Sequence, residues 1–327
     1  MSRARAMDRN VFITGAGGYI GSLTVAALAK SRGSVNRIIA ADIRQVPEDR
    51  RFAGVEYVTA DIRDPGLGTL FREHQVDIVV HLAAVVNPGK KPDRVFLHAV
   101  EVEGTRNVLK ACLSAGVKKF IYTSSGAAYG YYSDNPEWLN EDDLIRGNPE
   151  FPYSDHKRQV EEILADHRQA HPELKQLIFR CCTILGATAK NQITDLFDGK
   201  RVLGLTGCEI PFVLIWDMDV VGAILKGILE EDSTGIYNVA GDGILTMKEM
   251  ASLLGKPYVA VPPGLIKGAL WVMKKLRVTQ YGPEQVNFLR YRPVLSNRRL
   301  KEVFGFRPQK TTREVFQFFL ECRKRSG

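Results

Sequence analysis

The feature that most constrains this chain is a run of glycines that directly follows a short apolar segment. Residues 11–14 are Val-Phe-Ile-Thr, which is typical of a buried strand, and Gly15, Gly18 and Gly21 then recur at intervals of three. Such glycines allow a turn with positive φ, a close approach of the backbone to a phosphate, and close packing of the next helix. The unpaired N–H groups that open such a helix favour anions. The run therefore predicts a phosphate-binding strand–turn–helix unit.

Strand and helix patterns alternate along the first half of the chain. The expected strands after residues 11–14 are residues 37–41, 55–59, 78–81 and 119–123, and the expected helices are residues 20–31, 67–74 and 93–115. Alternation at this spacing indicates βαβ units around a parallel sheet. We therefore predict an α/β fold, a doubly wound parallel sheet of the Rossmann kind with a smaller C-terminal α+β cap.

The second half of the chain predicts a discontinuous arrangement, because residues 177–183 and 235–239 look like further strands of the main sheet. The expected parts are a basic tail at 1–10, a dinucleotide-binding domain at 11–184 with 216–240 returning to it, and a substrate-binding cap from 185–215 and 241–327.

An acidic residue ends the second expected strand. Asp42 lies 21 residues after Gly21. A carboxylate at this place accepts hydrogen bonds from the ribose hydroxyls of a dinucleotide and repels a 2′-phosphate, which favours NAD over NADP. Arg44 follows two residues later and keeps NADP as the less favoured alternative.

A Y-x-x-x-K spacing follows the expected fifth strand. Tyr153 and Lys157 stand on one face of a helix at this spacing, so the ammonium group lies near the phenol. A nearby cation favours the phenolate form, which suits the tyrosine to proton transfer. Ser125 comes just after the strand at 119–123, where its hydroxyl can hydrogen-bond a substrate oxygen. These three residues are the predicted catalytic set.

These motifs together resemble the extended short-chain dehydrogenases/reductases, the NAD-dependent epimerase/dehydratase family. The resemblance rests on the glycine motif, Asp61-Ile62, the run His81-Leu-Ala-Ala84, the Ser-Ser strand end and the Tyr153/Lys157 pair. Within that family the chain is most similar to a UDP-glucose 4-epimerase-like subgroup. That likeness lies in residues 144–153, 183–186 and 237–243.

The resemblance implies a role for each matching residue. Tyr153 would be the acid/base, Lys157 would also hold the nicotinamide ribose, and Ser125 would polarise the substrate. The cofactor-binding set implied is Gly15, Gly18, Tyr19, Ile20, Gly21, Asp42, Arg44, Asp61, Ile62, Leu82, Ala83, Ala84, Thr123, Tyr153 and Lys157. Family members also imply a homodimer, formed here through the helices near residues 93–115 and 153–169.

The chain departs from the family pattern at two places near the expected catalytic residues. Glu101 stands where the family usually has an asparagine, within the run Glu-Val-Glu-Gly-Thr. Gly126, Ala127 and Ala128 follow Ser125, where dehydratases carry an Asp-Glu pair and decarboxylating members a Glu. Because an elimination needs a second acid/base pair, this absence argues against both reactions and leaves epimerisation or simple hydride transfer.

The expected substrate segment between Gly186 and Ile215 is short and apolar, and it lacks the Arg-Asp-Phe-like run that helps nucleotide-sugar enzymes bind a diphosphate. A desolvated diphosphate needs cationic or N–H partners. The candidate substrate residues are Ser125, Lys200, Arg201, Trp216 and Arg292.

The leading hypothesis is an NAD-dependent oxidoreductase or epimerase that acts on a secondary alcohol or ketone, in the manner of a nucleotide-sugar 4-epimerase. One alternative is a dehydrogenase or ketoreductase of an apolar, steroid-like or acyl alcohol, which an apolar cap would suit. Another is a non-catalytic dinucleotide sensor on the same fold. The presence of both Tyr153 and Lys157 argues against the sensor.

A basic amphipathic stretch lies at residues 264–277. At 100° per residue, one face gathers Leu265, Ile266, Ala269, Leu270, Val272, Met273 and Leu276, and the other gathers Lys267, Lys274 and Lys275, with Trp271 between the lysines. The pattern most favours a cap helix buried on one face. The alternatives are an apolar lid over the substrate and an interfacial helix that makes peripheral membrane contact.

Composition narrows the other partners. The net charge of +8 is not gathered into a dense Lys/Arg block beside aromatic residues, so nucleic acid is not expected and a small-molecule substrate is. The five cysteines form no C-x-x-C pair, which predicts a reduced, cytoplasmic protein without a zinc site. The scattered histidines predict no other metal site.

Overall fold

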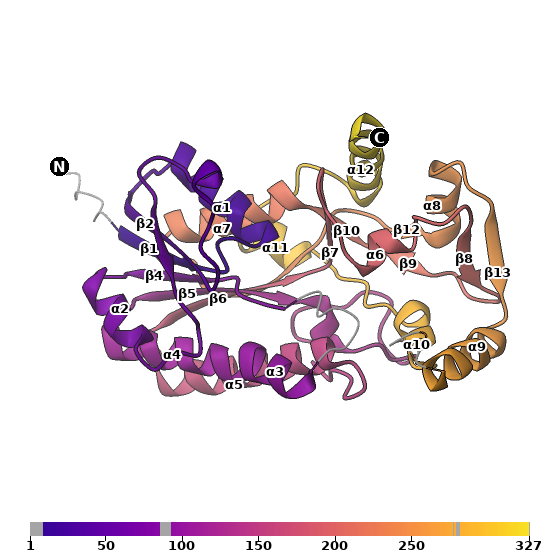
Figure 1. The fold of residues 1–327 in the computed structure, drawn as a ribbon, viewed down its shortest axis with the longest axis horizontal. Coiled ribbons are helices and arrows are strands. Elements are labelled where there is room, and N and C mark those ends of the chain that lie inside the picture. Colours follow the sequence, from indigo (N-terminus) through magenta and orange to yellow (C-terminus); the bar gives the residue numbers. More distant parts are fainter. Residues whose placement is uncertain (1–8, 86–92, 277, 279–281, 327) are drawn as a thin grey trace.

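A seven-stranded sheet forms the centre of the molecule (Figure 1). The computed structural model describes residues 9–85, 93–276, 278 and 282–326, so most of the predicted basic tail lies outside the described residues. The strands of the sheet are β1 (Arg9–Thr14), β2 (Val35–Asp42), β3 (Glu56–Thr59), β4 (Ile78–His81), β5 (Lys119–Ser125), β6 (Lys175–Cys181) and β11 (Gly235–Val239).

All neighbouring strands of this sheet run parallel, in the order β11-β6-β5-β4-β1-β2-β3. The order reverses between β1 and β4, and ligands of doubly wound sheets bind at the carboxyl ends of the strands beside such a reversal. Both faces are buried, so β1 is apolar without alternation: Val11 and Ile13 pack into one core and Phe12 into the other. The predicted parallel sheet is therefore confirmed.

Helices cover the two faces of the sheet. On one face lie α1 (Tyr19–Lys30), α7 (Asp217–Leu229) and α11 (Arg298–Glu302), and on the other lie α2 (Leu67–Glu73), α3 (Arg94–His98), α4 (Gly104–Ala115) and α5 (Pro152–Ala170). Short helical turns occur at η1 (Glu48–Arg50), η2 (Ala99–Glu103) and η3 (Gly126–Tyr129). The expected helix at 93–115 is thus interrupted: η2 is a π-helical turn between α3 and α4.

The helices begin and end where the side chains predict. The carboxylate of Asp93 caps α3 by accepting from the backbone N–H groups of Val95 and Phe96. Gly116 ends α4 in the left-handed region, at φ 70°. Pro152 opens α5, at a position where its missing N–H costs no hydrogen bond.

The smaller region follows β6 and is built from short pieces. Its strand pairs are β7 (Thr183–Leu185) with β10 (Leu214–Trp216), β9 (Pro211–Phe212) with β12 (Leu245–Thr246), and β8 (Val202–Leu205) with β13 (Tyr258–Val261); its helices are α6 (Gln192–Asp195), α8 (Met247–Leu253), α9 (Pro263–Lys275), α10 (Gln285–Arg290) and α12 (Thr312–Ser326). It has its own apolar core, which includes Phe197, Phe212 and Phe316. The α/β fold with a smaller C-terminal cap is confirmed, whereas the exact domain limits stay a prediction.

One expectation for the cap is wrong. The helix at 264–277 was expected to bury one apolar face, but none of the residues of α9 is buried. Only Ile266 and Leu270 pack partly against the cap core, whereas Leu265, Val272 and Leu276 are exposed. The physical reason is that α9 meets the cap along one narrow edge. Within the described residues, no helix is both long and apolar enough to cross a bilayer.

Candidate active site

The glycine turn joins β1 to α1 through two close backbone approaches. Gly15 has φ 67°, and a Cβ there would lie 2.7 Å from the Cα of Ala83 in the chain that follows β4. A Cβ on Gly21 would lie 2.0 Å from the carbonyl oxygen of Gly15. Side chains at either position would push the helix away from the strand ends. The helix begins at Gly18 without any side-chain cap, so its first N–H groups are available to an anion.

Asp42 lies against this turn. Its carboxylate accepts hydrogen bonds from the backbone N–H of Gly17 at 2.9 Å and of Arg44 at 3.1 Å. The side chain is therefore fixed at the carboxyl end of β2, beside the turn, where a ribose would meet it. The side chain of Arg44 is exposed.

A cleft opens along the carboxyl ends of β1, β2 and β4. Eight residues of the predicted cofactor set line it: Gly15, Gly18, Asp42, Asp61, Ile62, Leu82, Ala83 and Ala84. Hydrogen bonds from Arg63 hold the pKa of Asp61 below its ordinary value. A further apolar group lines the same cleft and was missed from the sequence: Ile43, Ala60, Val85, Phe96 and Val100.

Some of the missed residues carried a signal. Ile43 and Phe96 are exposed apolar side chains directly beside predicted elements, Ile43 after the strand-end acid and Phe96 near the start of the long helix. The guanidinium of Arg63 lies over the Phe96 ring at 5.3 Å. An apolar side chain at a strand end, where a polar turn residue is usual, indicates a surface for a flat aromatic group.

His81 ends β4 and is fully buried, held by two threonines. Its Nδ1 lies 2.8 Å from the Thr14 hydroxyl and its Nε2 lies 3.0 Å from the Thr105 hydroxyl. Because Thr105 donates its own proton to the carbonyl of Glu101, the ring must donate from Nε2 and accept at Nδ1. Burial, with a smaller contribution from Lys157, lowers the pKa of His81 to about 3. The neutral ring therefore connects β1 to the start of α4 through its two hydrogen bonds.

The three predicted catalytic residues come from β5 and α5. Ser125 is the last residue of β5, and its hydroxyl accepts from the backbone N–H of Ala127 at 3.1 Å. Tyr153 and Lys157 lie one turn apart near the start of α5, and the Lys157 ammonium is 5.7 Å from the centre of the Tyr153 ring. Tyr153 is 37% exposed, whereas Lys157 is buried. The tyrosine is therefore open to a ligand while the cation beside it is fixed inside the protein.

Lys157 is held by groups from two elements, β5 and η2. Its ammonium donates to the Tyr122 hydroxyl at 2.8 Å and to the carbonyl of Thr123 at 3.4 Å, both on β5. The buried carboxylate of Glu101, in η2, lies 3.7 Å away. Burial opposes the charged form, but Tyr122, Glu101 and Tyr153 outweigh it and raise the pKa of Lys157. The lysine is therefore a permanent cation.

Glu101, which replaces the usual asparagine, has two partners. One carboxylate oxygen faces Lys157, and the other accepts a short hydrogen bond from the backbone N–H of Val85. Val85 lines the cofactor cleft. Glu101 thus links the buried Lys157 cation to the loop that forms one wall of the cleft. An asparagine side chain is one methylene shorter and uncharged, so it would form no ion pair with Lys157.

A buried polar network supports the turn that follows Ser125. Arg180 on β6 pairs with Glu161 on α5 through three contacts of 2.6 to 3.0 Å, and Ser124 donates to the same carboxylate. Arg180 also donates to the Tyr129 hydroxyl in η3 and to the carbonyl of Glu141. These contacts join β5, β6 and α5, so they fix the relative positions of Ser125 and Tyr153.

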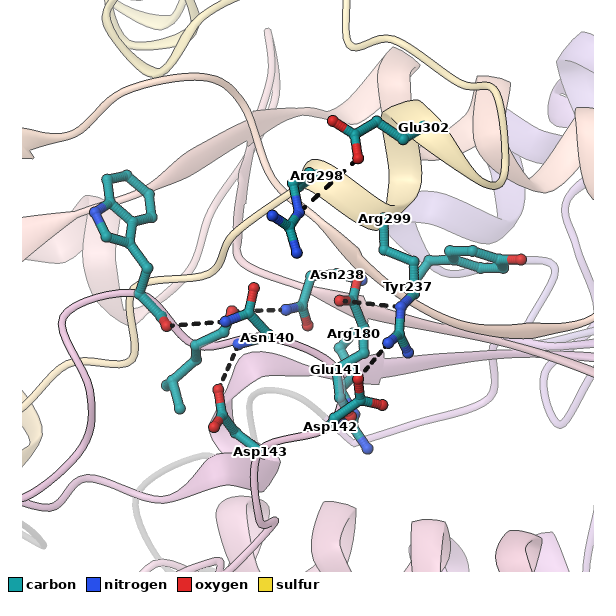
Figure 2. Close-up of polar contacts among 12 residues, drawn as sticks. Asn140, Glu141, Asp142, Asp143, Arg180, Tyr237, Asn238, Arg298, Arg299 and Glu302 are labelled. Atoms are coloured by element: carbon teal, nitrogen blue, oxygen red, sulfur yellow. Dashed lines mark hydrogen bonds and ion pairs between the residues drawn. The ribbon is translucent and has the colours of Figure 1, made fainter.

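Figure 2 shows the outer part of this network, where the segment around Asn140 lies between β6, β11 and α11. The Glu141 carboxylate accepts from the backbone N–H of Asn238 at 2.8 Å and lies 3.7 Å from Arg299. Arg299 also pairs with Asp142. Burial raises the pKa of Glu141, and these partners oppose that rise. These contacts join the segment around Asn140 to β11 and to α11.

Arg292 is the predicted substrate residue with the most unusual surroundings. Its guanidinium lies over the rings of Phe212 and Phe288, and one nitrogen donates to the Thr183 hydroxyl at 3.0 Å. The other terminal nitrogen, Nη1, is buried and has no hydrogen-bond partner among the residues that the structure describes. An unpaired buried N–H group is costly, so this guanidinium suits an anionic ligand.

The other predicted substrate residues lie elsewhere. Trp216 ends β10 and packs against Phe318 and Lys310, with its buried Nε1 unpartnered. Lys200 and Arg201 are exposed in the turn before β8, at the far end of the cap from the main sheet (Figure 1). Among the described contacts none joins these two to Arg292 or Tyr153.

Tyr19, a residue of the predicted cofactor set, donates a hydrogen bond from its hydroxyl to Asp217 at 2.6 Å, between α1 and the start of α7.

An aromatic cluster next to Arg292 was not found from the sequence. Tyr131 packs against Phe288 and Phe151 in tilted arrangements, with ring centres 4.9 and 5.7 Å apart. The Arg292 guanidinium lies over the Phe288 ring and Phe151 directly precedes α5, so the cluster lies between the cap and that helix. Burial raises the pKa of Tyr131 to about 12, which keeps it a neutral phenol.

Comparison with known proteins fixes the family. The model of the NAD dependent epimerase/dehydratase family matches residues 11–202, more than half of the chain. The chain belongs to this family. The likeness to extended short-chain dehydrogenases/reductases is therefore confirmed, and the family's NAD dependence agrees with the predicted preference for that cofactor.

Individual relatives are distant. An uncharacterised protein of Mycobacterium tuberculosis is 27% identical over 320 residues, covering 96% of this chain and 84% of the relative. A UDP-glucose 4-epimerase of Erwinia amylovora is 29% identical over 248 residues, covering 69% and 68%. The Thermus thermophilus UDP-glucose 4-epimerase complex with NAD has the same fold, with a TM-score of 0.71, 24% identity and coverage of 96% and 99%.

Proposed function

We propose that this chain is an NAD-dependent enzyme that epimerises the hydroxyl-bearing carbon of a nucleotide sugar. Two features together carry the proposal. Tyr153 is exposed beside the buried Lys157 cation, and Arg292 has a buried guanidinium nitrogen without a hydrogen-bond partner among the described residues. The first two groups suit proton transfer, and the third suits a diphosphate. Relatives in the family carry the name UDP-glucose 4-epimerase.

The residues at the cleft fit a dinucleotide. The turn at Gly15 and Gly21 leaves room for a pyrophosphate against the start of α1, and Asp42 lies where its carboxylate would accept hydrogen bonds from the ribose hydroxyls of NAD. Asp61 and Ile62 line the part of the cleft that would hold the adenine. Bound NAD would supply the acceptor and donor for hydride.

The protein's own groups would then handle the proton. Tyr153 Oη takes the proton from the substrate hydroxyl, and the Lys157 cation stabilises the phenolate that precedes this step. Ser125 Oγ hydrogen-bonds the same substrate oxygen and holds it near the tyrosine. Gly126, Ala127 and Ala128 supply no second acid or base, which favours return of the hydride to the opposite face over elimination.

The aromatic cluster of Tyr131, Phe151 and Phe288 favours a second candidate, a dehydrogenase of an apolar alcohol. In that case the same Tyr153 and Lys157 act, but the hydride leaves with the cofactor as net NADH. The two candidates differ in the fate of the cofactor, which gives a direct test.

The test is to denature purified protein, identify any released dinucleotide by mass spectrometry, and incubate native protein with UDP-glucose without added cofactor. We expect retained NAD and conversion to UDP-galactose without accumulation of NADH. An empty site with NADH formed stoichiometrically from an apolar alcohol, and not from UDP-glucose, would support the dehydrogenase instead. Absence of binding to either NAD or NADP would overturn both.

A further inference from the structure

Exposed apolar side chains gather on one helix at the outer end of the cap. Of the sixteen exposed large hydrophobic residues among those described, six fall within residues 265–278: Leu265, Trp271, Val272, Met273, Leu276 and Val278. Leu276 is 68% and Trp271 57% exposed. A contiguous exposed apolar surface of this kind usually marks an interaction site.

The geometry of α9 explains why this surface is left uncovered. At 100° per residue, Leu265, Ala269, Val272 and Leu276 share one face, and all four are exposed. Ile266 and Leu270 lie to one side of that face and pack partly against the cap core. The helix is thus held by one edge and lies at the periphery of the molecule (Figure 1).

The charge on the helix itself is of one sign. Residues 263–276 contain three Lys and no Asp or Glu. Lys267 is exposed, and the ammonium of Lys275 lies 5.2 Å from the centre of the Trp271 ring. Lys274 pairs with Glu284 at 2.9 Å. An exposed apolar strip on a helix whose polar face carries lysines is the pattern of helices that lie in the interface of anionic bilayers.

We propose that α9 docks the protein on an anionic lipid bilayer, with Leu265, Val272 and Leu276 entering the acyl boundary. The lysines on the polar face of α9 add electrostatic attraction to the lipid phosphates. A second copy of this chain fits the same face less well, because a two-fold interface would place like charges opposite one another. The proposal does not depend on the reaction catalysed, since α9 carries none of the predicted catalytic residues.

The test is co-sedimentation of the full chain with vesicles of phosphatidylcholine alone and with added phosphatidylglycerol. We expect binding only to the anionic vesicles, weakened by salt, and a blue shift of tryptophan fluorescence. The double variant Leu265→Gln/Leu276→Gln should bind at least about tenfold more weakly, because both apolar side chains would leave the acyl boundary. Leu203→Gln, 57% exposed but on β8, is the matched control.

A second pair of variants separates charge from apolar contact. Lys267→Glu/Lys275→Glu should also lower binding at least about tenfold, at roughly 1 kcal/mol per charge, whereas the exposed Lys248→Glu on α8 should not. Two outcomes would overturn the proposal. One is equal binding to neutral and anionic vesicles, or none. The other is a concentration-dependent dimer that the Leu265→Gln/Leu276→Gln variant abolishes, which would assign the strip to a second copy.

Discussion

The carboxyl end of the sheet and the cap differ in how they treat buried charge. Around the catalytic helix, Lys157 faces Glu101 and Arg180 faces Glu161, so each cation is compensated within the protein. In the cap, Arg292 keeps a buried nitrogen that has no hydrogen-bond partner among the described residues. The difference agrees with the proposal that an anionic ligand meets Arg292, whereas the cations at the sheet end have their partners inside the protein.

The largest expected effect comes from the catalytic end. Tyr153→Phe removes the group that moves the proton, so the rate of conversion should fall by about 10³-fold. Dinucleotide affinity, measured by thermal shift with NAD, should change little, because the ring and Lys157 remain. Normal turnover in the variant would show that another group carries the proton.

The compensated charges themselves give the next effect. Glu161→Gln leaves Arg180 buried without its counter-charge, and the free energy of unfolding should fall by about 3 kcal/mol or more. Glu162→Gln, on the next residue of the same helix and exposed, is the control and should change stability by less than about 0.5 kcal/mol. Urea denaturation measures both. Equal losses of unfolding free energy in the two variants would show that the buried pair contributes no more than the exposed one.

The cap predicts the opposite behaviour. Arg292→Met keeps the contact with Phe212 and Phe288 but removes the charge, so the KM for UDP-glucose should rise by about 10- to 100-fold. Stability should hold or increase, because an unpaired buried N–H disappears. Arg290→Met, at an exposed neighbouring position, is the control. An unchanged KM would mean that Arg292 does not meet the substrate.

The smallest effect sharpens the role of Glu101. Glu101→Gln removes a negative charge beside Lys157, so the field of this cation at the active site is no longer partly cancelled. The acid limb of the activity profile should therefore move to lower pH by on the order of one unit. The groups that face this pair are Tyr122, Tyr153 and His156. Glu103→Gln, exposed in the same turn, should leave the profile in place.

Local spacing was enough to predict much of the sheet end. The glycine turn, Asp42 and the Tyr153/Lys157 pair each depend on neighbours a few residues away or on one strand end, so their geometry follows from short patterns. Arg292 was named from charge alone, because Thr183 and Phe212, which hold it, are distant in sequence. No pattern in a single sequence fixes such long-range contacts.

The surroundings of other predicted residues also depend on parts of the chain that are distant in sequence. Lys200 and Arg201 looked suitable for a diphosphate by charge, but the fold of the cap places them in an exposed turn. The periodicity of α9 correctly indicated an amphipathic helix and wrongly indicated burial, since periodicity shows which residues share a face and not what covers that face. The aromatic cluster around Tyr131 joins three separate segments and left no local trace.

The π-helical turn at Ala99–Glu103 also has a consequence for how this chain tolerates change in length. A turn closed by i→i+5 hydrogen bonds contains one residue more than a turn of α-helix, so the helices before and after it stay in phase. Deleting one residue here would give an uninterrupted helix with the same faces toward the core, and folding would survive. The side chain opposite Lys157 would change, however. A single-codon insertion or deletion at this turn would therefore alter the surroundings of the buried cation while leaving the architecture intact.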